Sequence, residues 1–324
     1  NAAVFFEADG LEDLCVTADG RLAVASGAAV LALDEAGQAR TLATLDEPIQ
    51  ALAAYRDGLV AATCGSLHFI QGQMDGRQYR LPHASFAGCI NALCAHPDGS
   101  VVISEGSGQH AYAQWSRDLL SDGASGRVLQ YTPEGDQLRV LGQGLKYAYG
   151  ALVDAHGTVF TSESWAHRIV RLEPGGPRSV YQDLPGYPGR LARAGAGGYW
   201  LAVFAPRNQL VEFVLRETGF KNAMMAQVDP KYWIAPALSS GRDFFEPMQQ
   251  GGVRQMGILK PWAPARSYGL VVRLDVGFQP LYSLHSRVGG LHHGVTAVAE
   301  CHDALLVLCK GAGRVLRLPL SDIQ

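Results

Sequence analysis

The sequence predicts an all-β fold, a six-bladed β-propeller, from three observations. A unit made of an apolar strand, a short polar or glycine turn and a second apolar strand occurs six times along the 324 residues. Successive turns lie 38, 41, 58, 41 and 106 residues apart, which fits one four-stranded blade per unit plus two insertions. Helical periodicity is scarce. Radial closure of six such units leaves few strand edges exposed and makes one domain of residues 1–324.

The turns define the hairpin that begins each blade. They are expected at Asp19-Gly20, Asp57-Gly58, Asp98-Gly99, His156-Gly157, Gly197-Gly198 and Asp303-Ala304. Asp-Gly and Gly-Gly pairs tolerate positive φ and therefore suit tight hairpins. Third and fourth strands are expected at Gly126–Thr132, His167–Glu173 and Asn208–Leu215.

The two long gaps between turns predict insertions at about 107–125 and 217–267. The first has the composition of a short helical excursion, and the second contains apolar residues without strand alternation. Loops of this length in a compact domain are usually lids or binding elements. Both insertions are therefore candidates for lids over a ligand site.

Composition limits the classes of partner and the location. Apolar residues make up 48% and charged residues 18% of the chain, so a large core can form. The net charge is −3 without a basic stripe, which argues against a nucleic-acid partner. No apolar run approaches the roughly 18 residues that span a bilayer. The N-terminus has neither an initiator Met nor a signal-like region, so both a cytoplasmic location and export after removal of a leading segment stay open.

Six cysteines occur without any C-x-x-C pair, each within an apolar, strand-like context. An even number permits disulfides, but buried free thiols are the interpretation we prefer for a chain of this size. No spacing of cysteine and histidine fits a zinc site.

Alignment of the six units on their turns brings one polar residue into register in every blade. The position seven residues before each turn holds Glu12, Gln50, Asn91, Tyr149, Arg190 and Thr296. The first strand of each blade lines the central channel of a propeller, so these residues are predicted to form a ring around the axis at one mouth. Generic solvation of a wet channel is the alternative. Six different residue types favour an asymmetric site instead.

Several stretches in order resemble the strictosidine synthase-like family, which is related to the paraoxonases and to the gluconolactonase-type (SMP-30) propellers. The stretches are "INALCAHPDGSVVISEGS", "GRVLQYTPEG", "HRIVRLEPGG", "DLPGYPGRL" with "GGYWLAV", "SYGLVVRLD" and "VTAVAECHDALLVL". Together they lie between Glu12 and Leu318. The resemblance implies a six-bladed propeller with a small-molecule site at its axis.

The resemblance also implies a calcium ion in the channel of the hydrolytic members, held by carboxylate and asparagine oxygens. Glu12 with Asp13, and Asn91, match these ligand positions. Tyr149 and Arg190 stand where the family usually has an asparagine and an aspartate. Calcium takes six to eight oxygen ligands, and a guanidinium beside a dication is unfavourable. No residue matches the paraoxonase histidine pair, and Thr296 stands where strictosidine synthases have their catalytic glutamate.

The leading hypothesis is a small-molecule enzyme, hydrolase-like or lyase-like, acting in a channel-mouth pocket without the usual calcium and without another cofactor. Arg190, held by Glu12 or Asp13, is expected to bind a substrate carboxylate or an oxyanion. The proton-transfer candidates are Tyr149, His292 and His293. The remaining candidates for substrate binding are Gln50, Asn91, Thr296, His110 and Trp115.

Each assignment has an alternative. A calcium-dependent esterase or lactonase would use Glu12, Asp13 and Asn91 as metal ligands, and a non-catalytic propeller would bind a small molecule or a protein. His292 and His293 also fit ordinary loop positions. His110 and Trp115 fit packing of the first insertion. Glu105 and Glu163, which end second strands, fit solvated or salt-bridged carboxylates.

Overall fold

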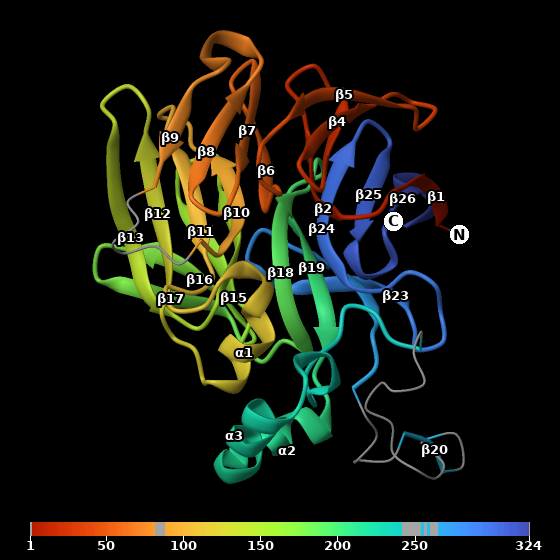
Figure 1. The fold of residues 1–324 in the computed structure, drawn as a ribbon. Helices are drawn as coiled ribbons and strands as arrows, with labels where there is room; N and C mark the ends of the chain where they lie inside the picture. The colour runs from red at the N-terminus through yellow and green to blue at the C-terminus, as the bar shows by residue number, and fades with distance from the viewer. Residues whose placement is uncertain (1, 82–87, 242–253, 256–257, 260–264, 324) are drawn as a thin grey trace.

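The chain folds into six four-stranded antiparallel sheets that together form a propeller, seen from the side in Figure 1. The computed structural model describes residues 2–81, 88–241, 254–255, 258–259 and 265–323. The first three blades, each from inner to outer strand, are β2 (Leu11–Val16), β3 (Leu22–Ser26), β4 (Ala29–Leu33) and β5 (Ala39–Thr44); β6 (Ala51–Tyr55), β7 (Gly58–Ala62), β8 (Ser66–Ile70) and β9 (Gln78–Arg80); and β10 (Ile90–Ala95), β11 (Val101–Glu105), β12 (Gly126–Thr132) and β13 (Gln137–Leu145).

The other three blades complete the circle, and the chain ends meet in the last one. They are β14 (Ala148–Val153), β15 (Val159–Glu163), β16 (Arg168–Glu173) and β17 (Gly176–Tyr181); β18 (Gly186–Arg193), β19 (Tyr199–Pro206), β22 (Gly269–Leu274) and β23 (Pro280–Ser286); and β24 (Val295–Cys301), β25 (Ala304–Cys309), β26 (Arg314–Pro319) and β1 (Ala3–Glu7). Because the first strand of the chain pairs with β26, the N-terminal segment closes the ring (Figure 1).

The inner strands form a closed circle in which each contacts the next, from β2 through β6, β10, β14 and β18 to β24 and back to β2. Apolar side chains between neighbouring sheets build the core in several clusters, one for each region where blades pack face to face. The predicted six-bladed propeller is therefore confirmed.

Glycine explains four of the six predicted turns. Gly20, Gly99, Gly157 and Gly197 have φ between 79° and 87°, a region that residues with a Cβ rarely adopt. The second and sixth turns lie one residue earlier than predicted, because Arg56 and His302 take the left-handed conformation there.

The first insertion contains the expected helical segment, η3 (Tyr112–Gln114) followed by α1 (Trp115–Leu120). The second contains α2 (Gln209–Arg216), α3 (Thr218–Gln227), η4 (Pro230–Tyr232) and the short pair β20 (Arg254–Gln255) and β21 (Ile258–Leu259). Residues 242–253, 256–257 and 260–264 of this predicted insertion lie outside the described residues. Figure 1 places α1, α2 and α3 at the same end of the molecule.

The strand expected at Asn208–Leu215 is wrong, because this segment begins helix α2. The Asn208 side chain accepts hydrogen bonds from the backbone N–H groups of Leu210 and Val211, which caps the helix. Val211 and Val214, one turn apart, are both buried. The third strand of the fifth blade is β22, after the insertion.

All six cysteines are free, as the sequence analysis preferred. Cys89 and Cys309 are buried, whereas Cys64 is exposed. No helix in the described part of the chain is long and apolar enough to cross a bilayer.

Candidate functional site

The predicted ring positions coincide with a recurring irregularity of the inner strands. In five of the six, pairing with the second strand shifts register next to the ring residue, namely between Leu11 and Asp13, Ile90 and Ala92, Ala148 and Ala151, Pro188 and Leu191, and Val295 and Ala297. In the remaining blade, Gln50 directly precedes β6. A β-bulge bends its strand and re-aims a side chain. The same offset from the turn therefore places a polar residue at the same height in each blade.

Arg190 and Asp13 form the charged centre of this ring. Nη2 of Arg190 lies 2.8 Å from Oδ2 of Asp13 and donates a hydrogen bond of 2.5 Å to the backbone carbonyl of Asn91. The backbone N–H of Leu52 also donates to Oδ2 of Asp13. The guanidinium therefore connects β18 with β2 and β10 across the channel.

The Asp13 carboxyl is buried completely, and its Oδ1 has no hydrogen-bond partner in the described part of the chain. Burial raises the pKa of Asp13 to about 7, and the Arg190 charge opposes that shift. The sequence predicted Asp13 only as a metal ligand or as a partner of Arg190. A carboxyl that titrates near neutrality beside a guanidinium is a new feature of the site, with no sequence signal beyond its position after Glu12.

Two of the other ring side chains bind backbone atoms of the following blade. Oε1 of Gln50 accepts from the N–H of Ile90 at 2.9 Å, and Nδ2 of Asn91 donates to the carbonyl of Ala148 at 2.9 Å. Oγ1 of Thr296 is buried and has no hydrogen-bond partner among the described residues. Burial raises the pKa of Tyr149 above its usual range, so its phenol is a poor base. The Gln50 and Asn91 side chains therefore link neighbouring blades and do not bind the Arg190 side chain.

Serine hydroxyls on the second strands hold the bulges in place. Oγ of Ser104 donates to the carbonyl of Gly150 at 2.9 Å, and Oγ of Ser162 donates to the carbonyl of Gly189 at 2.6 Å. A Cβ at residue 150 would lie 2.8 Å from the Gly189 oxygen, so only glycine permits this approach. Sequence reasoning missed both serines. The Ser-Glu pair shared by "VVISEGS" and "VFTSESW" was the available signal.

The carboxylates that follow these serines are structural. Glu105 and Glu163 are both fully buried and pair with Arg127 and Arg168 respectively. The salt-bridged alternative from the sequence is confirmed for both.

A second charged group closes the mouth where the inner strands begin. The Glu12 carboxylate accepts hydrogen bonds from the Lys310 ammonium and from the Tyr112 hydroxyl, and Nζ of Lys310 donates to the Tyr112 hydroxyl at 3.1 Å. Beneath them lies a cavity of about 20 Å³, lined in part by Asn91 and Tyr149. That volume holds about one water molecule.

An aromatic layer fills the rest of this mouth. The Trp165 ring stacks on Tyr147 with centroids 4.3 Å apart, and Trp115 packs near Trp165. The Trp165 indole N–H donates to Oδ1 of the buried Asp118 at 2.7 Å, and Nδ1 of His110 lies 3.0 Å from Oδ2 of Asp118. His110 therefore fastens the first insertion, while Trp115 lines the small cavity.

The structure does not bring the two loop histidines to the axis. His293 binds the Ser267 hydroxyl through Nδ1 at 2.8 Å and the Arg287 carbonyl through Nε2 at 3.1 Å. His292 lines a separate cavity of about 90 Å³ that includes Val295. Burial, and then the Arg314 charge, lower its pKa. Neither histidine contacts a ring residue within the described part of the chain.

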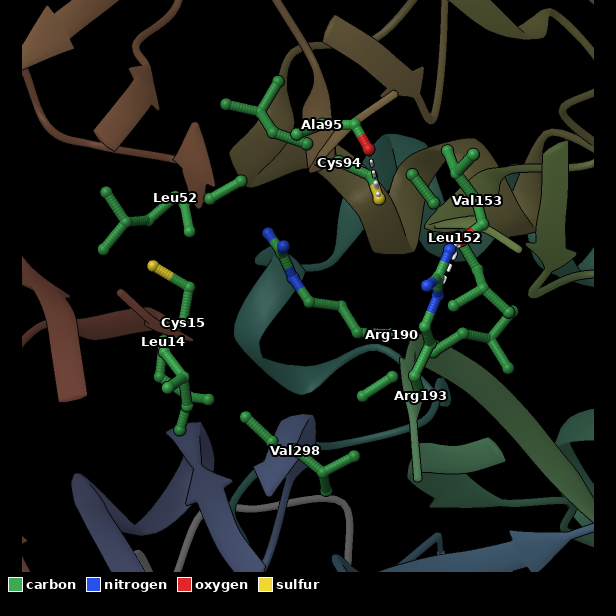
Figure 2. A pocket seen from close by; sticks show the side chains of 18 of the residues that line it. Leu14, Cys15, Leu52, Cys94, Ala95, Leu152, Val153, Arg190, Arg193 and Val298 are labelled. Atoms are coloured by element: carbon green, nitrogen blue, oxygen red, sulfur yellow. Dashed lines mark hydrogen bonds between the residues drawn. The ribbon is translucent and has the colours of Figure 1, made fainter. Parts of the chain in front are cut away.

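A much larger space along the axis lies on the other side of Arg190, toward the hairpin turns. It has a volume of about 480 Å³ and is lined by residues of all six inner strands. Figure 2 shows the Arg190 side chain reaching between Leu52 and Cys15 on one side and Cys94 on the other. Arg190 is the one ring residue that lines this cavity. The described residues therefore place the large pocket opposite the mouth where the sequence led us to expect it.

The donor set fits calcium poorly. Lys310 neutralises Glu12, Arg190 neutralises Asp13, and each carboxylate uses one oxygen for its cation. Within the described ranges, no three His, Cys, Asp or Glu side chains cluster so that they could hold a metal. A divalent ion at the ring would have to displace two internal cations.

No protein-family model matches the chain. The chain is similar to the adipocyte plasma membrane-associated protein of Salmo salar, with 27% identity over 223 residues, 66% of this chain and 47% of that protein. It is also similar to the protein Strictosidine synthase-like 10 of Arabidopsis thaliana, with 26% identity over 130 residues, 39% of this chain and 35% of that protein. The matched segments span less than half the length of these curated relatives.

Two solved structures share the fold. A calcium-binding protein, regucalcin, from Agrobacterium tumefaciens superimposes with a TM-score of 0.61 at 13% identity, covering 98% of this chain and 93% of that one. A gluconolactonase from Xanthomonas campestris gives a TM-score of 0.60 at 13% identity, covering 98% and 88%. The resemblance predicted from the sequence is confirmed by both kinds of relative.

Proposed function

Since this chain is a six-bladed propeller related to the strictosidine synthase-like and gluconolactonase-like proteins, we propose that it is a small-molecule enzyme of that group, hydrolase-like or lyase-like, which works without calcium. The observation that carries this proposal is the Arg190 guanidinium, which lies at the axis 2.8 Å from Asp13 and at the inner end of the large cavity. In this proposal a fixed cation takes the place of a metal.

Arg190 supplies the electrostatic part of the chemistry. A guanidinium presents several N–H donors in a rigid plane, which suits a carboxylate or a developing oxyanion. Its hydrogen bond to the Asn91 carbonyl and its ion pair with Asp13 hold that plane in one orientation. Substrate positioned against it would meet positive charge in a cavity with apolar walls, where electrostatic interactions are stronger than in water.

Asp13 acts as a positioning group for Arg190 and not as a proton-transfer residue, because it is fully buried and does not line the cavity. Its pKa of about 7 means that the charge beside Arg190 changes near neutral pH. Tyr149 stays protonated because burial raises its pKa, and the two histidines lie away from the axis.

The test combines a substrate screen with metal analysis of the purified protein. Lactones, aryl esters and amine–aldehyde pairs are offered to the wild type, to Arg190→Gln and to Arg178→Gln, an exposed arginine on β17 that serves as the matched control. We expect turnover that persists in chelator, falls at least about 100-fold in Arg190→Gln and stays unchanged in Arg178→Gln. Stoichiometric calcium on which activity depends would refute the proposal.

A second candidate is a non-catalytic propeller that binds a small molecule. The observation in its favour is the cavity lining, where the charged groups are Arg190 and Arg193 and no carboxylate appears among the described lining residues. If none of the substrates turns over while a ligand raises the melting temperature, this binding function replaces the enzymatic one.

A further inference from the structure

We propose that the cavity between Arg190 and the hairpin turns binds a small organic acid, with its carboxylate on the Arg190 guanidinium and a hydrocarbon body along the channel walls. As the substrate class of the enzyme this rests on the proposed function; as a binding site it stands independently. The cavity volume of about 480 Å³ lies within the range of roughly 300–1,000 Å³ typical of small-molecule sites.

The walls of the cavity select for a hydrocarbon body. They are built mainly from aliphatic side chains of all six inner strands, including Leu14, Leu52, Leu93, Leu152, Leu191 and Val298. A sugar or another polyol would leave many hydroxyls without partners against such walls, and each buried unpaired polar group is costly. An aliphatic or aromatic body loses nothing there and gains burial.

The single charged group at the inner end selects for an anion. Arg190 uses Nη2 for both Asp13 and the Asn91 carbonyl, which leaves Nε and Nη1 without a hydrogen bond among the described residues. Nε–H and Nη1–H point to opposite sides of the guanidinium, so a ligand carboxylate takes one charge-assisted hydrogen bond from one of these free donors. The Arg193 guanidinium, which donates through Nε to the Val153 carbonyl at 2.9 Å, adds positive charge near the turns.

The turn end of the channel gives access to this site. Cys15, Ala54, Cys94 and Ala299 line the cavity close to the hairpins and are all partly exposed to solvent. At the opposite mouth the cavity of about 20 Å³ is too small for an organic acid. In this proposal the ligand enters past the turns, where the small side chains of Ala54 and Ala299 line the cavity.

Asp13 is an internal competitor for the same guanidinium. It holds Arg190 from the side away from the cavity, because Asp13 itself is fully buried and does not line that space. Removing its charge while keeping its shape, as in Asp13→Asn, leaves Arg190 with an unneutralised positive charge. A ligand carboxylate then faces no internal rival, so its affinity should rise.

The experiment is calorimetric titration of the purified protein at pH 8 with octanoate, which needs no turnover. We expect Asp13→Asn to bind octanoate about tenfold more tightly or better than the wild type, and Arg190→Gln about tenfold more weakly or worse. Arg178→Gln, the exposed control, should bind like the wild type. Octylammonium, with the same chain and the opposite charge, should give no heat of binding.

Two further variants keep the result decisive. If Arg190→Gln does not fold, Asp13→Asn/Arg190→Gln removes both charges together, and it should also lose octanoate binding. Ala299→Trp narrows the turn end and should weaken binding about tenfold, whereas Ala36→Trp at an exposed outer turn should not. Octanoate affinity that is unchanged in Asp13→Asn and in the arginine variants overturns the proposal.

The enzymatic function and the acid-binding site can be disproved independently. Octanoate binding that depends on Arg190, without turnover of any screened substrate, removes the enzymatic function and leaves the acid-binding site. Turnover that depends on Arg190, without octanoate binding, keeps the enzyme and removes the substrate class proposed here.

Discussion

The two ends of the central channel are built from the same six strands, yet the described residues fill one end and leave the other open. At the end where the inner strands begin, the described residues leave about 20 Å³, and Lys310 and Tyr112 hold the Glu12 carboxylate across the gap. At the end where the hairpins turn, about 480 Å³ remains beside Arg190. The blades themselves are equivalent, so the difference comes from what the connections add.

The connections at the two ends differ in length and in side chains. At the closed end, the first insertion supplies Tyr112 and Trp115, and the segment after β25 supplies Lys310. At the open end, short connections of two to five residues supply little bulk, and alanines such as Ala54 and Ala299 line the rim. Loops placed by a rigid scaffold thus decide which end of a propeller channel a ligand can use.

Two adjacent residues of strand β2 form ion pairs at opposite ends of the channel. Glu12 pairs with Lys310 at the closed mouth, and Asp13 pairs with Arg190 at the inner end of the cavity. Both pairs are mostly buried, but only Asp13 is fully shielded from water. The comparison therefore predicts that the pair at the cavity is the more sensitive one to loss of a charge.

Arg190→Gln is expected to have the largest effect on stability. It removes the cation of a buried carboxyl, so Asp13 takes up a proton even at pH 8. Loss of the ion pair and of the hydrogen bond to the Asn91 carbonyl together costs about 3 kcal/mol of the free energy of unfolding. Urea denaturation of the variant and of Asp13→Asn/Arg190→Gln measures this cost, and the double variant should regain the part that belongs to the ion pair. Equal losses in the single and double variants would show that packing of the long side chain, rather than its charge, is what matters.

How far the sequence predicted this molecule depends on the range of each interaction. The hairpins were predictable because Asp-Gly and Gly-Gly turns answer a local backbone requirement at residues such as Gly20 and Gly99. The ring at Arg190 followed from the fixed distance between bulge and turn. The closed mouth could not be foreseen, because Lys310 meets Glu12 across 298 residues of sequence.

The sequence also could not predict which way a loop turns after it leaves its strand. His292 and His293 precede β24 immediately, but nothing in the chain says that they turn away from the axis toward Ser267 and the space between sheets. The segment at Asn208 reads equally well as strand or helix, because its apolar residues are closely spaced and include two β-branched valines. Its cap and its buried face decided for helix only in the folded structure.

Lys310→Met tests the closed end and should cost less than loss of Arg190. It removes one charged donor from Glu12, while the Tyr112 hydroxyl keeps its hydrogen bond to that carboxylate. We expect a loss of about 2 kcal/mol in the free energy of unfolding, measured in urea, with the exposed Lys146→Met as the control. Octanoate affinity should stay the same, since this residue lies at the end that the ligand does not use. A parallel loss of affinity would mean that the two ends are coupled.

The last prediction concerns pH, because the Asp13 carboxyl should make the free energy of unfolding change by a small amount with each pH unit. The pKa of Asp13 is about 7 in the folded chain against an ordinary value of 3.8, because burial outweighs the attraction of Arg190. Between pH 4 and pH 7 the folded protein therefore keeps a proton that the unfolded chain has released. The stabilisation is complete below about pH 4, and it is lost at about 1.4 kcal/mol per pH unit as the pH rises from 4 to 7.

Comparison with Asp13→Asn isolates this contribution, since asparagine does not titrate and all other groups remain. The free energies of unfolding of wild type and variant are measured in urea from pH 4 to pH 8, and their difference should change steadily between pH 4 and 7 and level off above. A difference that changes only below pH 4 would mean that Asp13 is ionised throughout, held by Arg190 as an ordinary ion pair. In that case Asp13 neutralises the guanidinium at physiological pH, and a ligand carboxylate has to compete with Asp13 for Arg190.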